Sequence, residues 1–279
     1  MAKILENSLR EWFQAFEDPV RRQRIWDLGL LTGLRERKGS DPAPANFERG
    51  LILDRLIEVR RPKRILEIGT GRGLGCLSMA AACRAHGAPA EIFTVDITPR
   101  DRKIRWALEL KGEKKVVHAS RDEIWQAHID PELLQPVHQL TGTSVQVLSK
   151  LARDNERFDL IFIDAGHDLF SVVYDLCYSA RLLNEGGMIL MDDFAPMEDF
   201  GIGTCMVVSH ARRWFNAVEI IESENVIYGP ATATPRGMVA LSELRAPRPS
   251  VDNLRMLWWR LAGFVVRACE SEKLFPLRG

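Results

Sequence analysis

A glycine-rich turn between a buried strand and a helix constrains this chain more than any other stretch. Arg64–Ile68 is a short apolar run that predicts a strand, and residues 74–84 are rich in small side chains and predict a helix. Between them lie three alternating glycines, Gly69, Gly71 and Gly73. Such a turn lets a ligand approach bare backbone, and the start of the helix offers unpaired N–H groups. We therefore expect a ligand-binding site here.

The spacing of the glycines excludes two common nucleotide motifs. A dinucleotide fingerprint requires Gly-x-Gly-x-x-Gly, but counting from Gly69 reaches Leu74, and counting from Gly71 reaches Cys76. A P-loop requires Gly-Lys-Ser/Thr after the turn, and this turn lacks it. The pattern that fits is acid-x-Gly-x-Gly-x-Gly, in which Glu67 is the acid. An ordinary tight strand-to-helix turn is the alternative.

The composition narrows the class of protein. The 279 residues are 46% hydrophobic and carry 38 basic and 38 acidic side chains, so the net charge is zero. This balance argues against a nucleic-acid binder that works by neutralising phosphates. The five cysteines are dispersed and form no Cys-x-x-Cys pair, which indicates reduced packing residues rather than a disulfide framework or a zinc site. We also predict no signal peptide, no membrane insertion and a cytoplasmic location.

Predicted strands alternate with predicted helices, which is typical of an α/β fold with a doubly wound, mostly parallel sheet. The apolar runs predict seven strands, at 64–68, 91–96, 137–140, 158–163, 188–191, 219–228 and 237–244. Helices are expected at 47–59, 74–84, 99–110, 145–153, 168–183 and 207–215. The segments 39–45 and 111–135 read as a loop and an irregular insertion, respectively.

Three parts of the chain follow from this pattern. We expect residues 1–45 to form an N-terminal helical cap, residues 46–246 the domain with the glycine turn, and residues 247–279 a C-terminal extension. The extension contains a predicted helix at 254–269 that is apolar nearly all round, apart from Arg260 and Arg267 on one narrow face. We expect this helix to pack on the domain or on a second copy in a homodimer or higher oligomer. Docking on a membrane surface is the weaker alternative.

Acidic side chains recur where the predicted strands end. Glu67, Asp96, Asp164, Asp192 and Asp193 all occupy such positions. In an open parallel sheet, ligands bind beyond the carboxyl ends of the strands. Asp96 follows the glycine turn at about the spacing at which an acid reaches ribose hydroxyls, although it could instead cap a helix. Glu67 could hold a ligand's ammonium group or brace the loop.

Two of these strand ends suggest a metal site. Asp164, Asp192 and Asp193 end strands that we expect to be adjacent, and three converging carboxylates repel one another unless a cation or proton lies between them. Oxygen ligands without a histidine and cysteine cluster suit Mg²⁺ or another hard divalent cation. Such an ion could bind substrate oxygens and lower the pKa of a hydroxyl. The alternative is a capped loop with solvated carboxylates.

The same region resembles a known family. Residues 158–167 read Phe-Asp-Leu-Ile-Phe-Ile-Asp-Ala-Gly-His, and residues 182–193 read Leu-Leu-Asn-Glu-Gly-Gly-Met-Ile-Leu-Met-Asp-Asp. These motifs are similar to those of metal-dependent O-methyltransferases, especially the natural-product branch that contains cephalosporin-hydroxylase-like proteins. The glycine turn resembles the first motif of class I S-adenosylmethionine-dependent methyltransferases. The similarity covers roughly residues 47–193.

The resemblance implies a Rossmann-like methyltransferase fold and a role for each site residue. The metal ligands would be Asp164, Asp192 and Asp193. The contacts with S-adenosylmethionine would come from Glu67, Gly69, Gly71, Gly73, Asp96 and Ser144. His167 stands where catechol-type enzymes place a lysine base, so it would act with Asp164 in catalysis. Because this chain has a histidine where those enzymes have a lysine, two roles stay open for His167. It could accept a proton from the substrate, or it could only hydrogen-bond to other residues of the site.

The sequence therefore predicts an S-adenosylmethionine-dependent methyltransferase that methylates a hydroxyl of a small molecule with the help of a divalent cation. The cap helices and residues 111–135 would cover the acceptor. A metal-independent small-molecule methyltransferase is one alternative. A non-catalytic protein that binds the cofactor and dimerises is another.

Overall fold

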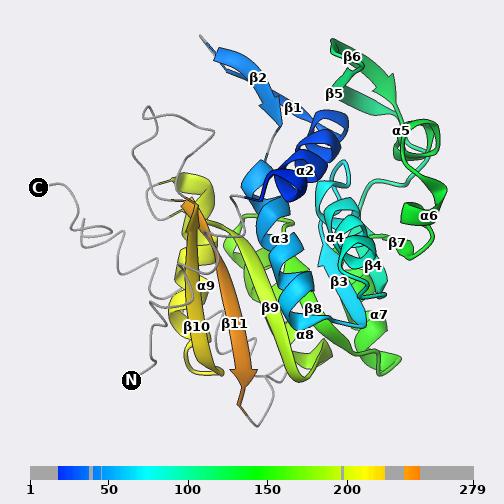
Figure 1. Ribbon diagram of the computed structural model, residues 1–279. Helices are drawn as coiled ribbons and strands as arrows, with labels where there is room; N and C mark the ends of the chain where they lie inside the picture. Colours follow the sequence, from blue (N-terminus) through cyan, green and yellow to red (C-terminus); the bar gives the residue numbers. More distant parts are fainter. Residues whose placement is uncertain (1–17, 38–39, 45, 196–197, 224–235, 246–279) are drawn as a thin grey trace, which may run out of the picture.

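The computed structural model describes residues 18–37, 40–44, 46–195, 198–223 and 236–245, and its centre is a seven-stranded sheet (Figure 1). The strands are β3 (Arg64–Ile68), β4 (Glu91–Asp96), β7 (Val137–Thr141), β8 (Phe158–Ile163), β9 (Leu183–Phe194), β10 (Phe215–Ser223) and β11 (Arg236–Leu244). Their order is β10-β11-β9-β8-β3-β4-β7. The five strands from β9 to β7 run parallel, whereas β11 pairs antiparallel with both of its neighbours. The predicted fold class is confirmed.

Helices cover both faces of the sheet (Figure 1). One core contains α3 (Phe47–Arg60) and α4 (Leu74–Ala85), with α2 (Pro19–Thr32) packed against them. The other core contains α7 (Ser144–Arg153), α8 (Leu169–Leu182) and α9 (Ile202–Ala211). Successive strand residues face opposite sides, so Ile65 belongs to the first core and Leu66 to the second. Strands buried on both faces explain the continuous apolar runs. The part of the chain that the structure describes contains no helix long and apolar enough to cross a membrane.

The segment between β4 and β7 differs from the prediction. It contains the hairpin β5 (Ile104–Leu110) and β6 (Glu113–Ala119), followed by α5 (Arg121–His128) and α6 (Pro131–Leu134). The expected helix at 99–110 and the expected irregular segment at 111–135 are therefore wrong. Trp106 and Leu108 alternate with more exposed residues and are 0% exposed, which is the pattern of a strand. Lys111 and Gly112 both have positive φ, at 53° and 79°, as the two-residue turn of a hairpin requires.

A second hairpin replaces the loop expected at 39–45. β1 (Leu34–Arg37) pairs antiparallel with β2 (Ser40–Pro44). The prolines of β2 suggested a loop because proline cannot donate to a sheet, but a two-stranded hairpin has an edge where no such donor is needed. The first part of the predicted cap, residues 224–228 of a predicted strand and the predicted helix at 254–269 lie outside the described residues.

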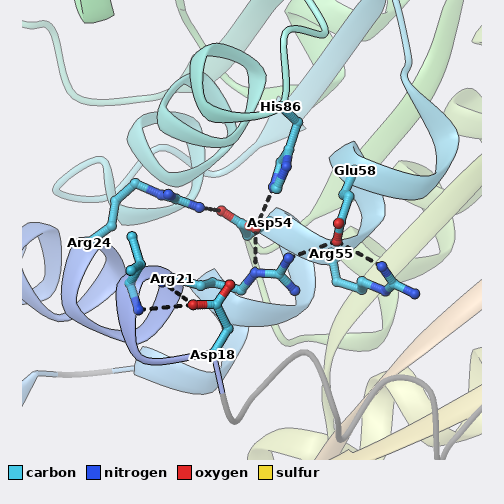
Figure 2. A network of polar contacts seen from close by, with 8 residues as sticks. Asp18, Arg21, Arg24, Asp54, Arg55, Glu58 and His86 are labelled. Atoms are coloured by element: carbon cyan, nitrogen blue, oxygen red, sulfur yellow. Dashed lines mark hydrogen bonds and ion pairs between the residues drawn. The ribbon is translucent and has the colours of Figure 1, made fainter.

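A buried charge network fixes α2 and α3 to the end of α4 (Figure 2). Asp54 of α3 is 0% exposed, forms ion pairs with Arg21 at 2.9 Å and with Arg24, and contacts Nε2 of His86 at 2.9 Å. Glu58, one turn further along α3, pairs with Arg21 and Arg55, both at 2.7 Å. Because three cationic or donor groups meet one buried carboxylate, Asp54 joins three helices through a single side chain.

Candidate functional site

The glycine turn lies at the point where the strand order reverses, between β3 and β8. Gly69, Gly71 and Gly73 have φ values of 102°, 55° and 101°. A Cβ atom on Gly69 would lie 1.9 Å from the backbone oxygen of Asp164, so only glycine allows the ends of β3 and β8 to approach this closely. Apart from Gly71 itself and its two chain neighbours, no residue has a heavy atom within 4 Å of the position that a Cβ on Gly71 would take. The turn therefore offers exposed backbone beside the end of β8.

Asp96 at the end of β4 is tied to this turn. Its Oδ2 accepts a hydrogen bond from the backbone N–H of Gly71 at 2.8 Å, and its Oδ1 accepts one from the N–H of Thr98 at 2.6 Å. Arg121, the first residue of α5, pairs with Oδ2 at 3.0 Å and also donates to the carbonyl oxygens of Gly71 and Thr98. The Arg121 side chain is 2% exposed. The inserted segment thus supplies a buried cation that fixes both the turn and its acid.

Glu67 lies beneath α4 rather than in the open part of the turn. It is 1% exposed, and its Oε2 accepts a hydrogen bond from the hydroxyl of Thr94. A Cβ on Gly75 of α4 would lie 1.9 Å from Glu67 Oε1, so the carboxyl group packs against the helix backbone. Burial raises the pKa of Glu67 to about 8. Of the two roles left open for Glu67, these contacts favour the brace, and its contact with a cofactor stays a prediction.

The raised pKa of Glu67 predicts a pH-dependent stability. Between the ordinary pKa of 4.5 and about 8, the folded state holds a proton on Glu67 that the unfolded state has lost. The free energy of unfolding should therefore fall as pH rises through this window, by up to about 1.4 kcal/mol per pH unit. Glu67→Gln removes this contribution, so urea denaturation at pH 5, 6, 7 and 8 should give a flatter profile for the variant. Parallel profiles for the two proteins would contradict the assignment.

The three predicted metal ligands come together. Asp164 follows β8, and Asp192 and Asp193 lie near the end of β9, with one oxygen of each within 4.8 Å of the others. Burial raises the pKa of Asp164 to about 6, although Arg49 opposes this shift. Asp193 has a φ of 58°, a left-handed conformation that aspartate tolerates better than most residues. We call these three residues the acidic cluster.

Arg49 and His167 contact the acidic cluster. Arg49, in the first turn of α3, forms ion pairs with Asp164 through Nη1 and with Asp192 through Nη2. His167 Nδ1 lies 2.9 Å from Asp193 Oδ2. The Arg49 side chain is 13% exposed, whereas that of His167 is 49% exposed. The cluster is therefore neutralised on its inner side by arginine and faces a histidine on its outer side.

Ser144 is the first residue of α7, which Thr143 caps by accepting a hydrogen bond from the N–H of Gln146. Asp175 of α8 is fully buried, and burial raises the pKa of its carboxyl group to about 7, while the Ser144 hydroxyl opposes the shift. Neither carboxyl oxygen of Asp175 has a hydrogen-bond partner among the described residues, so Ser144 lies near this carboxyl group without a hydrogen bond to it. The contact of Ser144 with a cofactor stays a prediction.

One cavity joins the glycine turn to the acidic cluster. Its wall combines the end of α2, the start of α3, the turn and two residues of the cluster, namely Thr32, Gly33, Asn46, Arg49, Thr70, Gly71, Arg72, Leu74, Gly75, Asp164, His167 and Asp193. The hairpin β5–β6 lies close by, because Arg72 donates to the carbonyl of Arg105 at 3.0 Å and Trp106 donates to that of Leu31 at 2.9 Å. A ligand at the turn would therefore lie next to the cluster.

Sequence reasoning missed Arg49 and Arg121. Both are cations in the first turn of a helix, where the helix dipole disfavours positive charge. An arginine at such a position needs another partner, and each of these two has found a carboxylate of the site. For Arg49, which lies in the helix predicted at 47–59, this mismatch was a signal present in the sequence, whereas the helix that begins at Arg121 was not predicted.

The chain is similar in sequence to known methyltransferases. Residues 66–194 match the family model of a methyltransferase domain. An O-methyltransferase from Aspergillus thermomutatus is 29% identical over 134 residues, which span 48% of this chain and 46% of that protein. The chain therefore covers about half the length of that relative.

Solved structures share the fold. The O-methyltransferase TomG from Streptomyces achromogenes, involved in tomaymycin synthesis and solved with S-adenosylmethionine, has a TM-score of 0.50 at 18% identity, over 84% of this chain and 96% of that chain. A methyltransferase from Podospora anserina with S-adenosylhomocysteine bound also has a TM-score of 0.50, at 17% identity, over 86% of this chain and 97% of that chain. The predicted resemblance to class I S-adenosylmethionine-dependent O-methyltransferases is confirmed in sequence and in fold.

Proposed function

We propose that this protein transfers the methyl group of S-adenosylmethionine to a hydroxyl group of a small molecule, with the assistance of a divalent cation. One observation carries the proposal, namely that the glycine turn and the acidic cluster form adjacent walls of one cavity. The contact between Gly69 and the backbone of Asp164 makes them neighbours. A methyl donor at the turn would therefore present its reactive group to an acceptor at the cluster.

The cofactor would lie along the exposed backbone of Gly71. Asp96 has about four acceptor sites on its two oxygens, of which Gly71, Thr98 and Arg121 use three. The remaining site suits one ribose hydroxyl rather than both. We propose that Arg121 acts by holding Asp96 and the turn in place, and that Ser144 contributes near the adenine, as the resemblance implies.

The acidic cluster fits a hard divalent cation such as Mg²⁺. Its donors are carboxylate oxygens from three residues that lie within 4.8 Å of one another. When bound, such a cation supplies positive charge that orients a hydroxyl and makes it more acidic. Arg49 contacts Asp164 and Asp192 from the α3 side, so it would have to leave these oxygens to make them available.

His167 would accept the proton of the acceptor hydroxyl. Its Nδ1 lies 2.9 Å from Asp193, and a proton held there puts the lone pair on Nε2. The side chain lies on the wall of the cavity and is 49% exposed, so an acceptor can reach it. The oxygen then forms a bond to the methyl carbon as the carbon–sulfur bond breaks, which leaves S-adenosylhomocysteine. Positioning of the two substrates provides much of the acceleration.

The acceptor would enter next to the end of α2 and the β5–β6 hairpin. Thr32 and Gly33 at the end of α2 belong to the cavity wall. The β5–β6 hairpin forms hydrogen bonds both with α2 and with the glycine turn. Tailoring of natural products is the biological setting that we propose, supported by the resemblance and by the tomaymycin enzyme that shares the fold.

Melting temperatures measured with S-adenosylhomocysteine, with Mg²⁺ and with both test this proposal. Each ligand that binds the folded state should raise the melting temperature. Turnover is then followed as S-adenosylhomocysteine production from a panel of phenols and sugars, with Mg²⁺ or with EDTA. Cofactor binding without turnover on any acceptor would favour a non-catalytic binding protein instead.

A second candidate is a metal-independent methyltransferase. The observation in its favour is Arg49, which already places a cation between Asp164 and Asp192. In that case, turnover should be the same with Mg²⁺ and with EDTA, and Mg²⁺ should leave the melting temperature unchanged. Turnover with Mg²⁺ and with EDTA, together with the melting temperatures, therefore distinguishes the metal-dependent enzyme from the metal-independent one.

A further inference from the structure

The guanidinium group of Arg49 contacts two of the three carboxylates that would hold a divalent cation. Its Nη1 pairs with Asp164 Oδ2, and its Nη2 pairs with Asp192 Oδ2. The two carboxylates come from the ends of different strands, and Arg49 reaches them from α3. A planar guanidinium donates through two nitrogens at once, so one side chain bridges both strand ends.

The surroundings hold Arg49 in this position. Its Cζ lies 5.9 Å from the centre of the Phe162 ring, a distance at which a cation is attracted to an aromatic face. The amide oxygen of Asn46, when turned toward Arg49, accepts from Nη1 and Nη2 at 3.3 Å each. Asn46 directly precedes α3. The residues at the start of α3 thus position this cation over the acidic cluster.

Arg49 and a divalent cation cannot use the same oxygens together. Both carry positive charge, and two cations on one pair of carboxylates repel each other at short range. Without either cation, the three carboxylates of the cluster would repel one another in a largely buried place. The cluster therefore needs one cation at a time.

We propose that Arg49 is a tethered cation that exchanges with the divalent cation. It neutralises Asp164 and Asp192 in the metal-free protein, and it moves away from them when the metal binds. Arg49 and Asn46 both belong to the wall of the cavity, so the displaced side chain has space next to its present position. The inference rests on the proposed function, because it assigns the acidic cluster to a divalent cation. Its consequence is that Arg49 weakens the affinity of the protein for that cation.

Titration of the full chain with Mn²⁺, followed by the electron paramagnetic resonance signal of free Mn²⁺, tests this exchange. Arg49→Met removes the competing charge and keeps a long side chain, so it should bind Mn²⁺ on the order of tenfold more tightly than the wild type. Arg55→Met is the matched control, because Arg55 lies on the same helix and pairs with Glu58. This control should bind Mn²⁺ as the wild type does.

The melting temperature of the metal-free protein provides a second test. In EDTA, Arg49→Met should melt at a lower temperature than the wild type, and saturating Mn²⁺ should restore most of the loss, because the metal neutralises the same carboxylates. Arg49→Lys keeps the charge but loses the two-nitrogen bridge, so in EDTA it should melt between Arg49→Met and the wild type.

The possible outcomes test the exchange of Arg49 separately from the existence of the metal site. If Arg49→Met binds Mn²⁺ no more tightly than the wild type, the exchange is refuted while the metal site stands. If neither Arg49→Met nor the wild type binds Mn²⁺, the metal part of the proposed function fails and the exchange fails with it.

Discussion

Replacing both Asp164 and Asp192 by asparagine is expected to lower the rate of methyl transfer about 100-fold or more, because charge stabilisation by a bound cation contributes several kcal/mol. Asparagine keeps the volume of each side chain and removes its charge. The double variant therefore loses the cation site whether the cation is a metal or Arg49, which pairs with both carboxylates. S-adenosylhomocysteine production from the acceptor with the highest wild-type turnover measures the effect.

Asp168→Asn is the control for this experiment. Asp168 follows Asp164 closely, but it caps α8 by accepting from the N–H of Ser171 at 3.0 Å and lies outside the acidic cluster. Asparagine is an equally good cap, so both stability and turnover should stay near those of the wild type. If the double variant keeps wild-type turnover, the acidic cluster is not the reacting site.

The second large effect concerns stability. Asp54→Asn is expected to lower the free energy of unfolding by about 3–5 kcal/mol, which is the cost of breaking a buried ion pair on one side. The side chain of Asp54 is 0% exposed and pairs with Arg21, Arg24 and His86 (Figure 2). Asparagine would leave these groups with a neutral partner in a buried place. Urea denaturation should show a lower midpoint with an unchanged slope.

Glu58→Gln is the matched comparison for Asp54. Glu58 lies on the same helix and also pairs with Arg21, but its side chain is 33% exposed. Exposed ion pairs contribute little, so this variant should lose no more than about 1 kcal/mol. If both variants lose the same free energy of unfolding, the burial of Asp54 does not determine how much its ion pairs contribute to stability.

The sheet was largely predictable from the sequence because its strands are buried on both faces. The bounds of β3, β4 and β8 agree with the prediction residue for residue, since each is a compact apolar run that ends in a glycine turn or an acid. The inserted hairpin was missed for a physical reason. Trp106 and Leu108 are buried by α2 and neighbouring helices rather than by the sheet, so their partners lie far away in the sequence.

The acids of the site were predictable because the carboxyl ends of parallel strands meet at one edge. Glu67 shows the limit of that reasoning, since its carboxyl group packs against the backbone of α4 although the residue is the last but one of β3. The arginines were not found, because no local pattern indicates which distant carboxylate a side chain will reach. The unfavourable position of Arg49 in the first turn of a predicted helix was a local trace, but the helix that begins at Arg121 was itself not predicted.

A calorimetric titration of the wild-type protein with S-adenosylhomocysteine, and separately with NAD⁺, tests the central claim most directly. It requires no knowledge of the methyl acceptor or of the metal. We predict that S-adenosylhomocysteine binds with saturable heat and that NAD⁺ does not bind, because the spacing of Gly69, Gly71 and Gly73 does not fit a dinucleotide. Failure to bind S-adenosylhomocysteine, or equal binding of NAD⁺, would contradict the assignment of the glycine turn to the methyl donor.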